Sequence, residues 1–266
     1  TSAMKMVSAA KLKKAQDAIT AMRPYANKLT ELLQSLSATL DADAGSKYAS
    51  QREVNKVLIV AITSNRGLCG GFNSNIIKET NRLVAEDFKD LDVSLFTIGK
   101  KGNDILSKSN TIFENNNKVF DDLTFDNVAE IAELIMDKFV DGEFDQIKLV
   151  YNKFKNAATQ IVMNEQFLPI VPVAEDSNVN LDYIFEPSKV EIVEQLIPKS
   201  LKTQLYKAIR DSFASEHGAR MTAMHKATDN ATELRDQLTL SYNKARQAAI
   251  TNEILEIVGG AEALNN

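Results

Sequence analysis

The residues best placed for chemistry form a glycine-rich stretch at 65–71, with the sequence Asn-Arg-Gly-Leu-Cys-Gly-Gly. It follows a predicted strand and precedes a predicted helix, which is where dinucleotide and phosphate loops are found. Its glycine spacing matches neither G-x-G-x-x-G nor the P-loop, and no Lys-Ser/Thr pair follows. We therefore interpret the glycines as permitting a tight strand-to-helix turn, with Asn73 or Ser74 capping the helix.

The other nucleophilic and metal-ligating side chains form no recognisable constellation. Cys69 could be a nucleophile at a helix N-terminus, but no base is placed for it, so it is interpreted as a small packed residue. His217 and His225 are roughly two turns apart on one predicted helix, beyond the reach of one metal ion. Ser215 and His217 would lie on different faces of that helix. The sequence thus predicts no catalytic residue, no metal site and no cofactor.

Composition and charge exclude several classes of protein. The chain has 266 residues and a formal net charge of −5, which argues against bulk binding of nucleic acid. Basic residues still concentrate in residues 1–23, either as a solvated helix face or as a surface for an acidic partner. Cys69 is the only cysteine, so no internal disulfide can form and an intracellular or matrix-side location is expected. The longest apolar run, Val57–Ile62, is far below the ~18 residues that span a bilayer.

A long helix is predicted at each end of the chain. Residues 199–258 contain no proline and only one glycine, Gly218, so one helix there would be roughly 90 Å long. A compact globule of this chain length would be roughly 45–50 Å across, so this helix must protrude. Residues 1–40 form a second helical pattern that continues on both sides of Pro24. Because the chain opens inside this pattern, we expect a further segment upstream of Thr1.

Each terminal helix carries an apolar stripe that recurs every three or four residues. Two such stripes on either side of an inserted domain are most simply buried if the helices pair as an antiparallel coiled coil. The C-terminal helix outlasts its partner, and its apolar end, Ile250–Val258, needs another partner. The stripes consist of Ala15, Ile19, Met22, Ala26, Leu29, Leu33, Leu36 and Leu40, and of Met224, Ala227, Ala231, Leu234, Leu238, Tyr242, Ala245 and Ala249.

The central part of the chain is predicted to be an inserted, Rossmann-like α/β domain with a mostly parallel sheet, because strands alternate with helices. The last two strands are joined by a short polar segment and should form an antiparallel hairpin. The predicted strands are 54–62, 93–98, 146–151 and 159–168, and the predicted helices are 75–88 and 128–140. The predicted organisation is an N-terminal coiled-coil helix (1–46), a central domain (54–173), a C-terminal coiled-coil helix (188–258) and a tail (259–266).

Four segments of the chain resemble the γ subunit of F-type ATP synthases: Ala3–Leu12, Ser64–Asn73, Asp182–Pro187 and Ser215–Thr251. The resemblance covers nearly the whole chain. It implies a non-catalytic subunit whose terminal helices form a rotor shaft inside the ring of α and β subunits. It also implies that the central domain packs above the membrane-embedded c-ring and beside the ε subunit. Proton flow would then turn the c-ring and the shaft, and the shaft would drive the catalytic sites on β and regulate ATPase activity.

Residue by residue, the resemblance implies two groups of contact positions. Contacts with the α/β ring are expected at Met4, Arg246, Gln247, Thr251 and Glu253. Contacts of the foot with the c-ring are expected at Tyr183 and Glu186. The implied location is peripheral, at the cytoplasmic face of the bacterial inner membrane, or alternatively at the matrix side of the mitochondrial inner membrane.

The residues leave two other classes of function open. One is a nucleotide-binding α/β enzyme whose helices only dimerise it, although the loop Gly67–Gly71 lacks phosphate-binding spacing. The other is a cytoskeletal or tethering coiled coil, which should carry large core residues and charged flanking pairs in regular heptads. The stripes of this chain are too rich in alanine and threonine for that class.

Overall fold

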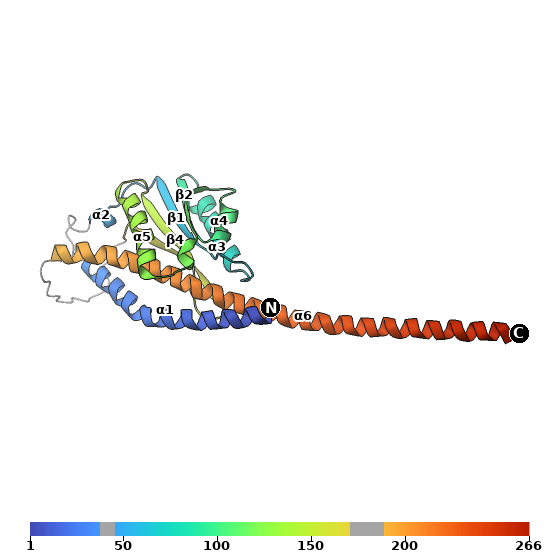
Figure 1. The fold of residues 1–266 in the computed structure, drawn as a ribbon. Helices are drawn as coiled ribbons and strands as arrows, with labels where there is room; N and C mark the ends of the chain where they lie inside the picture. Colours follow the sequence, from blue (N-terminus) through green and yellow to red (C-terminus); the bar gives the residue numbers. More distant parts are fainter. Residues whose placement is uncertain (38–45, 171–188, 266) are drawn as a thin grey trace.

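The computed structural model describes residues 1–37, 46–170 and 189–265 and has a strongly elongated shape (Figure 1). A compact α/β body lies beside α1 (Ser2–Ser37) and the first part of α6 (Lys189–Asn265), and the rest of α6 projects alone. At ~1.5 Å per residue, the 77 residues of α6 extend over roughly 115 Å. The predicted protruding helix is confirmed. It continues beyond residue 258, where the sequence suggested a separate tail.

The body is built on a five-stranded sheet with the order β3-β2-β1-β4-β5. The first four strands pair in parallel, and β5 pairs antiparallel with β4. The mostly parallel sheet and the terminal hairpin are therefore confirmed. The strands are β1 (Lys56–Ile62), β2 (Asp92–Ile98), β3 (Thr111–Asn116), β4 (Gln146–Phe154) and β5 (Gln160–Leu168).

Helices cover both faces of this sheet. Along β1, Leu58, Val60 and Ile62 contribute to the core on the side of α5 and α6. The alternate β1 residues join the second core, which includes residues of α3 and α4. A central parallel strand buried on both faces explains the uninterrupted apolar run in the sequence. The helices are α2 (Ser46–Ala49), α3 (Phe72–Arg82), a π-helical turn (Leu83–Asp87), α4 (Lys100–Leu106), a 3₁₀ turn (Lys118–Phe120) and α5 (Phe125–Val140).

The connection from β2 to α4 passes very close to the end of β1. Gly99 has a φ of 106°, and a Cβ atom there would lie 2.3 Å from the carbonyl oxygen of Thr63. No side chain can be accommodated at that distance, so glycine is required. Gly102 lies inside α4, and its N–H donates a hydrogen bond to Thr63 Oγ1 at 2.9 Å.

The terminal helices pair antiparallel, as predicted. Lys5 near the start of α1 lies 3.2 Å from His225, and Arg23 farther along forms an ion pair with the fully buried Asp211 at 3.3 Å. Pro24 lies inside α1, which bends but does not end (Figure 1). The predicted α1 stripe is buried at Ala15, Ile19, Ala26 and Leu29, with Leu12 in addition, and Met22 is half-buried. The side chains of Leu33, Leu36 and Leu40 lie outside the described residues.

The predicted stripe on α6 is only partly paired. Thr1 lies opposite Thr228, with their hydroxyl oxygens 2.9 Å apart. Beyond that point, the described part of α1 offers nothing to pack against. The stripe positions from Ala231 to Ala249 are accordingly exposed, and the prediction that α1 buries them is wrong for the residues described.

Candidate functional site

The predicted contact residues lie at two separate levels along the shaft. Arg246, Gln247, Thr251 and Glu253 are exposed on the projecting part of α6. Met4 is 43% exposed on α1, near the level of His225. At ~1.5 Å per residue, roughly 30 Å of helix separates the two levels. The structure therefore does not gather these residues into one site. Tyr183 and Glu186 lie outside the described residues.

The projecting part of α6, residues 229–265, carries many large apolar side chains at its surface. A single helix with exposed apolar residues is typical of a surface that a partner covers. Among the described residues, no helix has the combination of length and apolarity that crossing a bilayer requires. The exposed apolar side chains are Leu234, Leu238, Leu240, Tyr242, Ile250, Ile254, Leu255, Ile257 and Val258.

A groove of about 540 Å³ opens at the other level, between α1, α6 and the loop that follows β1. Met4 lines it, so this predicted contact residue belongs to a concave surface. Exposed Lys11 and Arg66 give the groove a basic rim, and Asp121 is the one exposed acidic side chain among its described lining residues. Its apolar lining comes from Met4, Val7, Leu68, Phe120 and Phe213.

Leu68 is an unusual member of that lining. Its φ of 62° is in the left-handed region, which residues other than glycine rarely adopt, and its side chain is 62% exposed. Strained backbone that displays an apolar side chain at the surface is found at binding sites, where the strain has a use.

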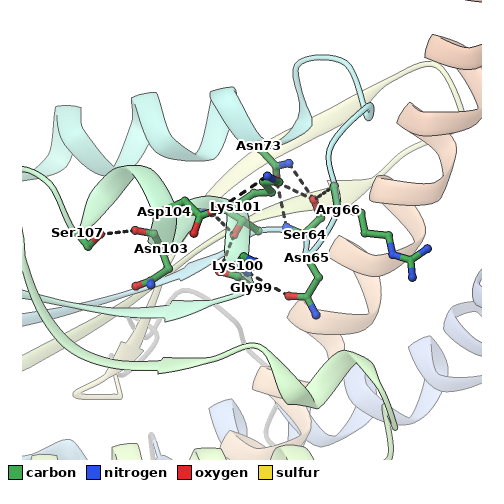
Figure 2. Close-up of polar contacts among 12 residues, drawn as sticks. Ser64, Asn65, Arg66, Asn73, Gly99, Lys100, Lys101, Asn103, Asp104 and Ser107 are labelled. Atoms are coloured by element: carbon green, nitrogen blue, oxygen red, sulfur yellow. Dashed lines mark hydrogen bonds and ion pairs between the residues drawn. The ribbon is translucent and has the colours of Figure 1, made fainter.

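Hydrogen bonds to the first turns of α3 and α4 fix the first part of the loop after β1 (Figure 2). The N–H of Ser64 donates to Asn73 Oδ1 at 2.9 Å, and the N–H of Lys101 donates to the carbonyl of Ser64 at 3.0 Å. The N–H of Lys100 donates to Asn65 Oδ1 at 3.1 Å. In Figure 2 the side chain of Arg66 points away from these contacts.

Neither side chain predicted to cap α3 does so. The side chain of Asn73 turns back to Ser64, and the hydroxyl of Ser74 donates to the carbonyl of Gly71. Cys69 is the small packed residue that was predicted, in a cluster with Phe72 and Ala219. Its burial raises the pKa of the thiol, which disfavours the reactive thiolate.

The second part of the loop binds an arginine of α6. Arg220 donates to the carbonyl of Arg66 at 3.0 Å and twice to the carbonyl of Gly67 at 3.3 Å. Its guanidinium also forms an ion pair with Glu216 at 2.7 Å, and both side chains are about nine-tenths buried. A phosphate loop presents N–H groups to its ligand. This loop presents carbonyl oxygens at Arg66 and Gly67, which suit a cation.

Sequence reasoning missed the roles of Arg220 and Glu216. The available signal was the oppositely charged pair at i, i+4, Glu216 and Arg220, within residues 214–220, where the other residues apart from His217 are small. That signal is weak, because such pairs are common on solvated helix faces.

The two histidines, eight residues apart on α6, lie in different environments: His225 is exposed and His217 is buried. His217 is 5% exposed, and its ring meets that of Phe213 edge-on at 4.5 Å. Burial, with smaller contributions from Arg220 and Lys11, lowers the pKa of His217 to about 4. Ser215 donates to the carbonyl of Asn152, not to a histidine. Within the described residues no group of His, Cys, Asp and Glu could hold a metal ion.

The lowered pKa of His217 predicts a pH dependence of stability. Between pH 6.5 and about 4, the unfolded chain binds a proton at this residue that the folded chain does not, so stability is lost as the pH falls. The free energy of unfolding contributed by this residue should drop by about 3 kcal/mol across that window. Urea unfolding of the wild type and of His217→Gln at several pH values measures the difference, with His225→Gln at the exposed histidine as control. Equal pH slopes for the wild type and His217→Gln would contradict the prediction.

Comparison with known proteins gives the family. The sequence model of the ATP synthase family matches residues 1–264. The chain is 74% identical to the ATP synthase gamma chain of Flavobacterium psychrophilum over 265 residues, covering 99% of this chain and 92% of the relative. It is 72% identical to that of Flavobacterium johnsoniae, covering 100% and 93%.

A solved structure agrees with these relatives. A chain of the central stalk and c-ring of the Tetrahymena thermophila mitochondrial ATP synthase superposes with a TM-score of 0.64 and 26% identity, covering 85% of this chain and 98% of that chain. Family match, sequence identity and fold all extend over most of the molecule. The chain therefore belongs to the family of ATP synthase gamma chains, the non-catalytic central-stalk subunits of F-type ATP synthases.

Proposed function

We propose that this chain is the rotor shaft of a proton-driven F-type ATP synthase, which couples ion flow through the c-ring to conformational cycling of the catalytic β subunits. In this role it also regulates ATPase activity. The observation that carries the proposal is the projecting part of α6, an uncovered helix with an apolar surface far from the α/β body. We assign the shaft to residues 1–46 and 188–258, the foot to residues 54–173, and a terminal extension to residues 259–266.

The predicted ring contacts at the tip share one side of α6. At 100° per residue, Arg246, Gln247, Thr251 and Glu253 fall within a sector of roughly 160°. The exposed apolar residues Ile250, Ile254 and Ile257 fall within the same sector. Polar groups set among apolar ones on one face are the pattern of a specific protein interface. We propose that this sector faces the α/β ring.

The groove beside Met4 supports a second contact with the ring. Its apolar lining and the basic rim of Lys11 and Arg66 are complementary to an acidic segment that carries apolar side chains. We propose that a β subunit supplies this segment. The basic character of residues 1–23 is then a partner surface as well as a solvated helix face.

We propose that Tyr183 and Glu186, which follow the foot in the chain, contact the c-ring, and that the foot lies beside the ε subunit. The complex would then place this chain at the cytoplasmic face of a bacterial inner membrane, as a peripheral subunit. The bacterial origin of the two gamma chains compared above supports that location over the mitochondrial alternative.

Reconstitution with α and β subunits tests the proposal. The full chain should co-elute with them as a stoichiometric complex with altered ATPase turnover, and deletion of residues 242–266 should abolish both effects. The deleted residues are exposed and make no contact with the α/β body in the described part of the chain, so circular dichroism should show the body intact. Failure of the full chain to co-elute would refute the shaft function.

A further inference from the structure

One short stretch of α6, residues 211–222, is the last that the α/β body holds before the helix runs free; we call it the joint. Beyond Met224 the described side chains of α6 are exposed, apart from Ala227 and Thr228, which are half-buried near the start of α1. Torque between the body and the projecting part of α6 can therefore pass directly through the joint, or indirectly through α1, which pairs with α6 as far as Thr228 and donates a hydrogen bond from Arg23 to the carbonyl of Phe154.

On one side, the joint contacts the β4–β5 hairpin through small groups. Ser215 donates to the carbonyl of Asn152 at 3.0 Å, and Thr222 donates to the carbonyl of Ala157 at 3.1 Å. A Cβ atom at Gly218 would lie 3.1 Å from Cα of Ala157, so the two backbones are in close contact. These contacts hold the helix near the hairpin but act close to the helix axis.

On the other side, Phe213 stacks against Phe120 and Ala219 packs against Cys69 and Phe72, while the hydrogen bonds from the described residues of the joint come from Arg220. Its planar fork of donors binds two successive carbonyls, and Glu216 holds the guanidinium at 2.7 Å. The loop that supplies these carbonyls is itself tied to α3 and α4 by the hydrogen bonds of Figure 2. Arg220 therefore connects α6 to the ends of β1 and β2.

The geometry of the two sides resists rotation of the helix about its axis. At 100° per residue, Arg220 lies about 140–200° around the helix from Ser215, Gly218 and Thr222. A guanidinium reaches farther from the axis than a hydroxyl or a glycine does, so its hydrogen bonds have the longest lever arm. With Arg220 released, no hydrogen bond from the described residues of the joint would reach the loop after β1. Rolling would then be opposed by the packing of Phe213 and Ala219, by the Arg23–Asp211 ion pair and by the short contacts with the hairpin.

We propose that Arg220 is a positioning residue that fixes the rotational setting of α6 on the α/β body and thereby transmits torque across the joint. This inference rests on the proposed function as a rotor shaft. Arg220 touches no reacting group, and it acts by holding the two halves of the rotor in register.

The test uses Arg220→Lys in the complete ATP synthase in membrane vesicles. Lysine keeps the positive charge beside Glu216 but cannot bind two carbonyls as a planar fork. ATP hydrolysis and ATP-driven proton pumping are measured in the same vesicles. Hydrolysis should persist, while protons pumped per ATP should fall at least about twofold, the lower end expected for residues that couple distant sites. A purely structural defect would lower both activities together and leave the ratio unchanged.

Controls separate the possible failures. Arg82→Lys makes the same chemical change on α3, at an arginine paired with Glu79 and Asp87, and should leave the pumping ratio unchanged. If Arg220→Lys does not assemble, Glu216→Gln, which frees the guanidinium from its ion pair, decides the question by the same ratio. An assembled variant with the wild-type ratio would overturn the role of Arg220. Failure of the wild-type chain to assemble would refute the shaft function instead.

Discussion

Replacing Arg220 by methionine is expected to lower the free energy of unfolding by about 3–5 kcal/mol, because it removes one partner of a buried ion pair. Glu216 is 7% exposed, and its carboxylate would lose the guanidinium that lies 2.7 Å away. The carbonyls of Arg66 and Gly67 would lose their donor at the same time. Urea unfolding of the isolated chain at pH 7 measures the loss.

A double variant identifies the source of this loss. Glu216→Met combined with Arg220→Met removes both charges and should recover most of the stability, because no buried charge is left unpaired. If the double variant loses as much free energy of unfolding as Arg220→Met does, the cause is the unpaired loop carbonyls and not the unpaired carboxylate.

The loss of unfolding free energy in Arg220→Met should also depend on pH. Burial already raises the pKa of Glu216, and Arg220 opposes that rise. Without Arg220 the folded-state pKa lies further above the unfolded-state value, so the folded chain takes up a proton more readily as the pH falls. The destabilisation is therefore fully present above the folded-state pKa and shrinks below it. Unfolding curves at pH 7 and pH 5 should show a smaller deficit at the lower pH.

The elements predicted correctly are those whose residue pattern is dictated by burial. The apolar run of β1 and the helical period of α5 follow directly from their buried faces. β3 was missed because it is an edge strand with a polar sequence, Thr-Ile-Phe-Glu-Asn-Asn, and half of its surface needs no burial. α4 was missed because Gly99 just before it and Gly102 within it indicate a turn, whereas close packing against Thr63 requires both glycines.

The uncovered tip of α6 and the joint differ in how far the sequence predicts them. The uncovered tip follows from the length of α6 and its apolar residues. The joint could not be predicted, because Arg220 and Gly67 are 153 positions apart and nothing in their local sequence pairs them. The glycine spacing excluded a phosphate loop but gave no indication that the loop's carbonyls bind an arginine.

Replacing Ile250, Ile254 and Ile257 together by glutamine is expected to weaken assembly with the α/β ring while leaving the isolated chain as stable as before. These side chains are 47%, 55% and 71% exposed, so changing them should alter the free energy of unfolding by less than about 0.5 kcal/mol. If the ring buries them, loss of about 3 kcal/mol of apolar burial corresponds to roughly a hundredfold weaker association. Binding to purified α and β subunits measures the first effect, and urea unfolding measures the second.

A matched triple variant on the opposite side of α6 makes the comparison specific. Ala245→Gln, Ala249→Gln and Asn252→Gln place the same side chain at exposed positions outside the sector of the three isoleucines. We expect a much smaller loss of assembly for this control. If the two triple variants lost equal affinity for the α and β subunits, the ring would contact the tip evenly on all sides. If the isoleucine variant lost no affinity, the tip would not be part of the interface. A loss confined to the isoleucine side would give the shaft one face that differs from the rest. A shaft needs such a face if successive β subunits are to meet different contacts as it turns.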